Sequence, residues 1–599
     1  MNIKNAAQIE RPKGEAPGEP QFGSDVVAQT LRALGVPYIA LTPGASFRGL
    51  HDSLVNFLGN RDPQMLLCLH EEHAVAIAQG YAKVTGQPLA VALHSNVGLM
   101  HATMAIFNAW CDRMPVVILG ATGPVDAMKR RPWIDWIHTA RDQGALVRPY
   151  VKWDDQPASP GAAREALLRA HWHAVAAPQG PVYVNLDAQM QEMRLPAPLP
   201  AIDPARYLSS GTVAATAEAM REAVALLRGA QRPVLLIGRV SRDLAGWDAR
   251  VALAEALHAR VVTDLKIGAA FPTDHPLHVD APGVHLRAAA AAAIAGADVI
   301  LSLDYVDLAG TLKTACGGEC PAKVIQVSLD HVVHNGWSMD HQGHPPVDLF
   351  IAATPEAVVP ALIEALGPLA KQAPCAKPAH TFAPEPPANG LIDTDQLALA
   401  LRRAIGERPY SLSHLPLSWN GASWPFRHPL EFLGSDGGGG IGGGPGIAVG
   451  AALALRGSGR LSVAVCGDGD YMMGVTALWT ATHYRIPLLI VITNNQSFYN
   501  DEMHQERVAR MRDRPVENKW IGQRIADPDV DMVALARAQG AMGFGPIAHR
   551  DDLAAVLATA IDTVSRGGVA VVDVRVLAGP TPGVAAPAAT TTTSKSDRG

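Results

Sequence analysis

Two short polar motifs follow apolar stretches rich in β-branched residues in the last third of the chain. One stretch leads into Gly467-Asp468-Gly469 and the other into Asn494-Asn495. Parallel sheets bind ligands beyond the carboxyl ends of their strands, so two neighbouring strands would place Asp468 beside Asn495. Carboxylate and amide oxygens suit Mg²⁺, and the glycines let the backbone approach a phosphate closely. The two motifs indicate a metal that bridges to a bound diphosphate.

Either motif alone would more simply be a turn or a helix cap. Their combination and spacing resemble the cofactor motif of the enzymes that depend on thiamine diphosphate (ThDP). By this resemblance the side chains of Asp468 and Asn495 bind Mg²⁺ together with the main-chain oxygen of Ser497. The resemblance also implies that Gly467 and Gly469 contact the diphosphate.

A glycine-rich segment, 437–445, lies upstream of these motifs. It formally matches the G-x-G-x-x-G pattern, which would make the protein a Rossmann-type nucleotide-binding module, although no clear strand leads into it. The resemblance to ThDP enzymes instead implies that Gly439 contacts the cofactor and that Ile441 wedges it into its bent form. Ser413 and His414, at the preceding strand end, match a segment that touches the diphosphate, with a capped loop as the alternative.

The sequence His70-Glu71-Glu72 passes from a predicted strand into a predicted helix. An acidic residue in the first turn favours the helix dipole, and this role suffices for Glu72. The run from Glu71 to Ala82 resembles the stretch that carries the cofactor-activating glutamate of acetolactate synthases and benzoylformate decarboxylases. Glu71 is therefore predicted to bond the aminopyrimidine and favour its imino tautomer, whose nitrogen removes the thiazolium C2 proton.

The next predicted strand ends in Leu93-His94-Ser95, which resembles benzoylformate decarboxylase rather than acetolactate synthase. A lone histidine at a strand end is usually structural, but this resemblance implies that His94 and Ser95 act in proton transfer at the substrate. Two features differ from benzoylformate decarboxylase. Ser46 follows Pro-Gly-Ala instead of Pro-Gly, so it would take part only if the loop shifts, and Asp304 follows a strand where a second histidine is expected.

Two proline-rich segments, 195–204 and 379–390, divide the chain into three blocks that each alternate short apolar runs with helical patterns. This predicts three α/β domains with mostly parallel central sheets. The predicted boundaries are 1–21 for a disordered amino-terminal segment, 22–195 for a pyrimidine-binding domain, 205–378 for a central Rossmann-like domain, 390–578 for a diphosphate-binding domain and 579–599 for a disordered tail. The predicted elements include strands at 65–69, 88–93, 116–119, 181–186, 233–237, 260–263, 299–303, 323–327, 461–465 and 488–493, and helices at 74–84, 101–110 and 475–484.

Composition narrows the class of partner. The 599 residues carry 50 basic and 56 acidic side chains, a net charge of −6, without the basic block that nucleic acids or anionic membranes require.

The most apolar run, 288–303, is interrupted by Asp298 and predicts no membrane span, and no signal peptide is recognised. Six scattered cysteines fit the cytoplasm. The one close pair, Cys316 and Cys320, predicts loop thiols rather than a metal site.

These patterns predict a ThDP- and Mg²⁺-dependent enzyme that cleaves the C–C bond next to a 2-oxo group. The resemblance favours non-oxidative decarboxylation of an aromatic or bulky 2-oxo acid. An acetolactate synthase-like carboligase and a lyase acting on a diketone or a 2-hydroxyacyl thioester are alternatives. In this family the two ends of ThDP bind to different subunits, which implies a homodimer at least and a homotetramer by analogy. Some relatives bind FAD in the central domain, but no residue set here requires it.

Overall fold

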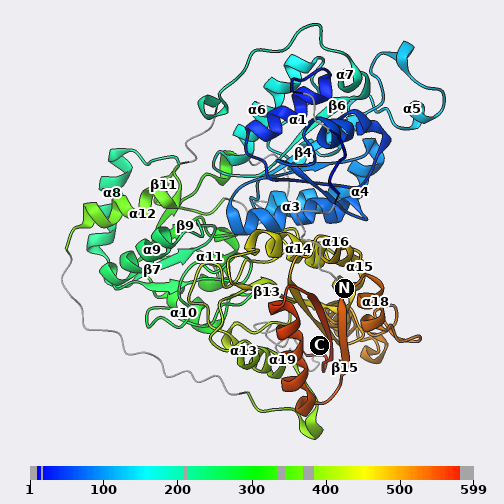
Figure 1. Cartoon of the computed structure of the whole chain (residues 1–599). Coiled ribbons are helices and arrows are strands. Elements are labelled where there is room, and N and C mark those ends of the chain that lie inside the picture. The colour runs from blue at the N-terminus through cyan, green and yellow to red at the C-terminus, as the bar shows by residue number, and fades with distance from the viewer. Residues whose placement is uncertain (1–9, 15–17, 208–211, 333–343, 369–383, 580–599) are drawn as a thin grey trace, which may run out of the picture.

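The chain folds into three layered α/β units (Figure 1). The computed structural model describes residues 10–14, 18–207, 212–332, 344–368 and 384–579. Each unit has a central parallel sheet, and inner strands such as β4, β9 and β14 are buried on both faces, as long apolar runs predict. The predicted fold class of three α/β domains is confirmed. The predicted carboxyl-terminal tail lies almost entirely outside the described residues.

The first unit carries its strands in the order β2-β1-β3-β4-β6-β5. These strands are β1 (Tyr38–Leu41), β2 (Gln64–Leu67), β3 (Leu89–Ala92), β4 (Val116–Thr122), β5 (Asp154–Asp155) and β6 (Pro181–Asp187). The helices are α1 (Gly23–Ala33), α2 (Arg48–Asp52), α3 (Glu71–Thr85), α4 (Ser95–Cys111), α5 (Ile134–Ile137), α6 (Pro160–Val175) and α7 (Ala188–Glu192). Sequence analysis overlooked β1, which is short and lies between β2 and β3.

The central unit carries its strands in the order β11-β10-β9-β7-β8. They are β7 (Pro233–Ile237), β8 (Arg260–Val262), β9 (Val299–Leu303), β10 (Lys323–Val327) and β11 (Leu349–Ile351), and the helices are α8 (Ala217–Gly229), α9 (Leu244–Leu257), α10 (Ala288–Ala295), α11 (Leu308–Cys316) and α12 (Pro355–Leu366). The apolar run 288–303 is divided between α10 and β9. Among the described residues, no helix combines the length and the hydrophobicity that a membrane crossing needs.

The last unit carries its strands in the order β12-β13-β14-β16-β15. They are β12 (Tyr410–His414), β13 (Leu461–Gly467), β14 (Leu488–Asn494), β15 (Met542–Ile547) and β16 (Val569–Arg575). The helices are α13 (Thr394–Ile405), α14 (Gly444–Leu455), α15 (Asp468–Gly474), α16 (Ala477–His483), α17 (Tyr499–Met511), α18 (Met532–Ala538) and α19 (Arg550–Ser565). The predicted helix 475–484 corresponds to α16, and a separate helix, α15, begins at Asp468.

Helices α3 and α14 join the first unit to the last (Figure 1). Glycine permits the close approach, because a Cβ on Gly80 would lie 2.0 Å from the carbonyl oxygen of Ile447 and one on Gly450 would lie 1.9 Å from that of Ile77. Buried side chains of both helices belong to one hydrophobic cluster that includes residues of both sheets. The two units therefore share a core and hold a fixed relation to each other.

The described part of the amino-terminal segment also contacts the last unit. Glu10 accepts hydrogen bonds from the Tyr484 hydroxyl at 2.8 Å and from the His483 ring at 3.2 Å. Its carbonyl oxygen accepts a bond from Asn60 at 3.1 Å. Residue 10 thus connects the first unit to the last beside the joint made by α3 and α14.

Replacing Gly450 by Ala tests the helix joint. The new methyl group would overlap the Ile77 carbonyl, and overpacking of this kind costs about 1–3 kcal/mol, so we expect a lower thermal unfolding midpoint for Gly450→Ala. Gly161→Ala is the control, because this helical glycine has nothing within 4 Å of its Cβ position and alanine there stabilises by about 0.5–1 kcal/mol. Equal unfolding midpoints for the two variants would contradict the assigned contact.

Candidate active site

The motifs at Asp468 and Asn495 meet at one edge of the last sheet. Strands β13 and β14 are parallel neighbours with Gly467 opposite Thr493, as the prediction requires. The amide of Ser497 donates to Asp468 Oδ2 at 3.2 Å and to Asn495 Oδ1 at 3.0 Å. The side-chain oxygens of the two predicted metal ligands are therefore held by one backbone donor.

The donor set at this edge fits a hard cation. Asp468 is buried at 3% exposure, and burial raises the pKa of its carboxyl group although the amides of Gly469 and Ser497 oppose the shift. The hydroxyl of Ser497 donates to Glu502 at 2.5 Å, so its proton is not available to Asp468. A carboxylate, an amide oxygen and the main-chain oxygen of Ser497 are hard ligands of the kind Mg²⁺ prefers. A cation here would offset the cost of burying Asp468.

A buried carboxylate organises the glycine-rich segment. Asp470 Oδ1 accepts hydrogen bonds from the amides of Gly442 at 2.7 Å and Gly444 at 3.3 Å, where α14 begins. In a Rossmann-type loop such amides face the pyrophosphate of the ligand. Here the Asp470 carboxylate accepts the hydrogen bonds of these amides instead. The segment also follows a loop rather than a strand. The geometry therefore argues against the nucleotide-binding module considered above.

His414 lies against the same carboxylate, with its Nε2 3.2 Å from Asp470 Oδ2. Burial disfavours the charged imidazole, but the charge and hydrogen bond of Asp470, together with the charge of Asp436, raise the pKa of His414. Burial likewise opposes ionisation of Asp470, but the charge and hydrogen bond of His414, together with the two glycine amides, lower the pKa of this carboxyl group. His414 Nδ1 is buried without a partner among the described residues, which leaves one ring nitrogen for a ligand.

The remaining residues predicted to contact the cofactor differ in their surroundings. Ile441 is 45% exposed and is the one bulky side chain in the glycine-rich segment. Gly439 has a φ of +72° and nothing within 4 Å of its Cβ position, so space is open beside it. Ser413 is fully buried and donates its hydroxyl to the carbonyl of Val463 at 3.1 Å. Its hydroxyl proton is therefore used in a hydrogen bond to the neighbouring strand.

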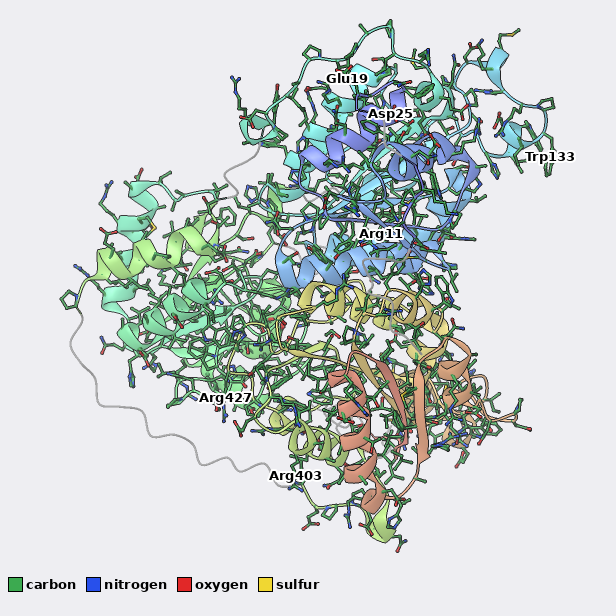
Figure 2. All side chains as sticks on the ribbon, viewed as in Figure 1. Arg11, Glu19, Asp25, Trp133, Arg403 and Arg427 are labelled. Atoms are coloured by element: carbon green, nitrogen blue, oxygen red, sulfur yellow. The ribbon has the colours of Figure 1, made fainter. Side chains whose placement is uncertain are left out.

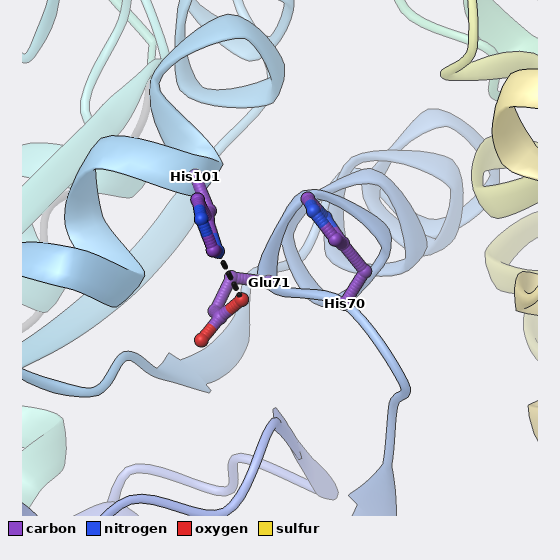
Figure 3. A group of neighbouring side chains, drawn as sticks. All are labelled: His70, Glu71 and His101. Carbon is purple, nitrogen blue, oxygen red and sulfur yellow. Dashed lines mark hydrogen bonds and ion pairs between the residues drawn. The ribbon is translucent and has the colours of Figure 1, made fainter.

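Glu71 occupies the first position of α3, where His70 caps the helix by accepting a hydrogen bond from the Glu72 amide at 3.1 Å. The Glu71 carboxylate is largely buried and lies 3.1 Å from His101 Nδ1 (Figure 3). The ring of His70 stacks on that of His101 with 5.1 Å between centroids. No sequence pattern indicated His101, because only the packing of α3 against α4 brings it to Glu71.

The two neighbouring glutamates lie in different surroundings. Glu72 faces the last unit, where burial and the charge of Asp470 raise the pKa of its carboxyl group. Glu71 faces α4, and Gly98 separates it from His94: a Cβ on Gly98 would lie 3.2 Å from Glu71 Oε1 and 3.4 Å from His94 Cβ. Glu71 and His94 therefore share one edge of the first sheet.

Ser46 reaches His94 from the loop after β1. Its hydroxyl oxygen lies 2.9 Å from His94 Nδ1 and accepts a hydrogen bond from the amide of Ser95 at 3.1 Å. The fold of this loop therefore brings Ser46 into contact with His94. Ser95 is buried and donates its own hydroxyl to Asn96 at 2.7 Å. Burial and the neighbouring His138 lower the pKa of His94, and Glu71 opposes this shift.

Asp304, found where a second histidine was expected, takes part in an ion network instead. It accepts a hydrogen bond from Ser328 at 2.6 Å and lies 4.0 Å from Arg239. Burial, with a contribution from Asp330, raises the pKa of Asp304 to about 6. Asp330 pairs with Arg239 at 2.9 Å and with Arg113 of the first unit at 2.7 Å. Asp304 thus belongs to the contact between the first and central units.

Comparison with known proteins places the chain in one family. Three family descriptions match in order: "Thiamine pyrophosphate enzyme, N-terminal TPP binding domain" over residues 22–146, the corresponding "central domain" over 220–362, and the "C-terminal TPP binding domain" over 417–574. Thiamine pyrophosphate is another name for ThDP. The chain belongs to the ThDP-dependent enzymes, so the resemblance in its motifs is confirmed.

Curated relatives include enzymes of two kinds. Benzoylformate decarboxylase of Pseudomonas aeruginosa is 28% identical over 501 residues, which cover 80% of this chain and 86% of the relative. The acetolactate synthase large subunit of Lactococcus lactis subsp. lactis is 25% identical over 537 residues, which cover 87% of this chain and 88% of the relative. The family thus relates the chain to decarboxylases and to carboligases.

Solved structures confirm the fold. The ThDP-dependent 4-hydroxybenzoylformate decarboxylase of Rhodococcus jostii RHA1 has a TM-score of 0.74 and 24% identity, covering 93% of this chain and 99% of its own. Benzoylformate decarboxylase from Polynucleobacter necessarius has a TM-score of 0.77 and 21% identity, covering 94% of this chain and 100% of its own. The order and layering of the three units are those of this fold.

Substituting Ser46 by Ala tests the contact with His94. Because Ser46 accepts from the Ser95 amide, we assign its hydroxyl proton to His94 Nδ1, a bond that only the neutral ring can receive. Removing it destabilises the neutral ring, so the pKa of His94 rises in Ser46→Ala. Titration of ¹³C-labelled histidine by NMR measures the change.

Ser53→Ala is the control for this titration. Ser53 is buried in the same unit, but its hydroxyl oxygen lies 2.8 Å from the Ser24 hydroxyl and 2.7 Å from the Asp25 carboxylate, not beside a histidine. Its loss should leave the pKa of His94 unchanged. A His94 pKa that stays constant in Ser46→Ala as well would contradict the assigned proton.

Proposed function

We propose that the protein is a ThDP- and Mg²⁺-dependent decarboxylase that acts without an oxidant on an aromatic or bulky 2-oxo acid. The observation that carries the proposal is the hydrogen bond between Ser46 and His94, formed on the same sheet edge as Glu71. It supports the benzoylformate decarboxylase type of site over the acetolactate synthase type, because a serine bonded to an imidazole near Glu71 suits the protonation of a substrate.

The edge of the last sheet would hold the diphosphate. Asp468, Asn495 and the main-chain oxygen of Ser497 would bind Mg²⁺, and Gly467 and Gly469 would allow the phosphates to approach. Asp470 fixes the glycine-rich segment through two backbone amides. Ile441 is the exposed apolar side chain against which a bent cofactor could rest. Bound ThDP would supply an electron sink for the bond next to the 2-oxo carbon.

At the edge of the first sheet, protons would be held and transferred by Glu71, His94 and Ser46. The buried carboxyl group of Glu71 suits a hydrogen bond to the aminopyrimidine that keeps the reactive tautomer populated. The lowered pKa of His94 favours a neutral ring at neutral pH, and Ser46 orients it through Nδ1. With Nδ1 bonded to Ser46, Nε2 of His94 would be the ring nitrogen that serves the substrate. Ser95 supports this arrangement through its amide.

We also propose a homodimer as the minimal active unit, in which Glu71 of one chain serves the cofactor held by the other, and a homotetramer as the larger assembly.

The acetolactate synthase relative favours a second candidate function, the joining of two 2-oxo acids. In that reaction a second carbonyl compound, rather than a proton, reacts at the carbon that lost CO₂. The fate of that carbon therefore distinguishes the two functions.

Incubating the protein with ThDP and Mg²⁺, and with either benzoylformate or pyruvate, tests the proposal. We expect benzaldehyde and CO₂ from benzoylformate, identified by mass spectrometry. His94→Ala should lower aldehyde release about 10²-fold or more, the range of general acid–base effects, while ThDP still binds. Acetolactate from pyruvate without aldehyde from benzoylformate would favour the carboligase instead.

Asp468→Ala and a chelator are the controls for the metal. Asp468→Ala should remain folded but lose retention of ThDP on gel filtration, because the buried carboxylate is its proposed metal ligand. Removing divalent ions from the wild-type protein should abolish turnover, and added Mg²⁺ should restore it. Stoichiometric ThDP in Asp468→Ala would reject the assigned ligand set.

A further inference from the structure

A protruding segment, 123–138, begins and ends beside His94. Its two ends are joined by a hydrogen bond from the Gly123 amide to the His138 carbonyl at 3.2 Å. Asn96 Nδ2 donates to the carbonyl of Ile137 at 3.1 Å, which fixes the end of the segment to the start of α4. Figure 2 shows Trp133 at the outer end of this segment, far from the sheets. The anchored end therefore has a defined position at the active edge.

The anchoring places the imidazole of His138 against that of His94. The two ring centroids lie 4.6 Å apart, and the ring planes are nearly perpendicular at 73°. Both residues are partly exposed, unlike His171 and His278, which are buried histidines of the described core. Neither ring is therefore part of the buried core, and a ligand at this edge could contact both.

Electrostatics makes the two rings a coupled pair. A positive charge on one imidazole disfavours protonation of the other at this distance, so the pair holds one proton more readily than two. The groups that face His94 are Ser46 on Nδ1, His138 from the protruding segment and Glu71 across Gly98. A pair with one proton beyond its two neutral rings contains an imidazolium that can donate a proton and a neutral imidazole that can accept one.

We propose that His138 is the second proton-transfer residue of this enzyme and takes the place of the histidine missing from the central unit. The inference rests on the proposed decarboxylation. His138 belongs to the first unit and lies in the segment that follows β4. No sequence motif indicated a catalytic role for it. Asp304, at the position where the second histidine was expected, is held by Arg239 and Ser328 instead.

The proton balance needs two groups. Decarboxylation of a 2-oxo acid anion takes up one proton and gives an aldehyde and CO₂. After CO₂ leaves, its former carbon keeps the electron pair, and an N–H of the imidazole pair transfers its proton to form the new C–H bond. The other imidazole accepts the hydroxyl proton of the former carbonyl as the C=O bond of the aldehyde reforms and the bond to the cofactor breaks. The hydroxyl proton would derive from the C2 proton that the cofactor gives up on activation, so the pair ends with the protons it began with. The one proton consumed overall comes from water, when C2 regains its proton.

The first test uses the protein without cofactor or substrate. We expect the pKa of His94, measured by NMR of ¹³C-labelled histidine, to rise in His138→Asn, because the variant removes a neighbouring positive charge. His173→Asn is the matched control, since this histidine lies on α6 against Trp153 and Trp172. A His94 pKa that is the same in His138→Asn and the wild type would overturn the pairing.

The second test compares CO₂ with aldehyde in the holoenzyme. In His138→Asn, we expect the first turnover to release CO₂ at the wild-type rate, whereas aldehyde release falls about 10²-fold. A purely structural role would slow both. An unchanged ratio of aldehyde to CO₂ in an active enzyme would overturn the inference alone. No CO₂ from any 2-oxo acid with the wild-type enzyme would overturn the proposed function and the inference with it.

Discussion

The close crossing of α3 and α14 is the constraint on which the arrangement of the site depends. Glu71 is the first residue of α3, and the glycine-rich segment leads directly into α14. Since Gly80 and Gly450 bring the two backbones into contact, neither helix can turn or slide without moving one edge of the site. The crossing therefore fixes the edge that carries Glu71 relative to the edge proposed to bind the diphosphate within each chain. It also limits how two chains could meet around a shared cofactor.

Buried charge is the second organising feature. Asp470 is ion-paired with His414 and also holds two amides of the glycine-rich segment, so this loop has a shape before any ligand arrives. Asp468 lies nearby and is buried with backbone donors alone among the described residues. Preorganised groups of this kind lower the cost of binding a charged cofactor, because little reorganisation remains to be made. The same burial explains why the carboxyl group of Asp468 has a raised pKa.

The sequence predicted the features that depend on chain-local patterns. Apolar runs located the main strands, and Gly467-Asp468-Gly469 and Asn494-Asn495 located the edge proposed to bind a metal, because both motifs follow neighbouring strands. It could not predict His101 or His138, whose roles depend on how α4 and the segment 123–138 pack. The spacing after Pro-Gly did not decide whether Ser46 takes part in the site. Only the fold of the loop after β1 shows its contact with His94.

The central claim is that Glu71 activates a ThDP molecule held by the last unit. The most direct measurement is the rate at which the C2 proton of bound ThDP exchanges with deuterium, followed by NMR. The account predicts that Glu71→Gln binds ThDP but exchanges this proton orders of magnitude more slowly than the wild type, because an amide cannot drive the tautomer. Glu72→Gln, altered at the neighbouring position, should exchange at the wild-type rate. Wild-type exchange in Glu71→Gln would contradict the account.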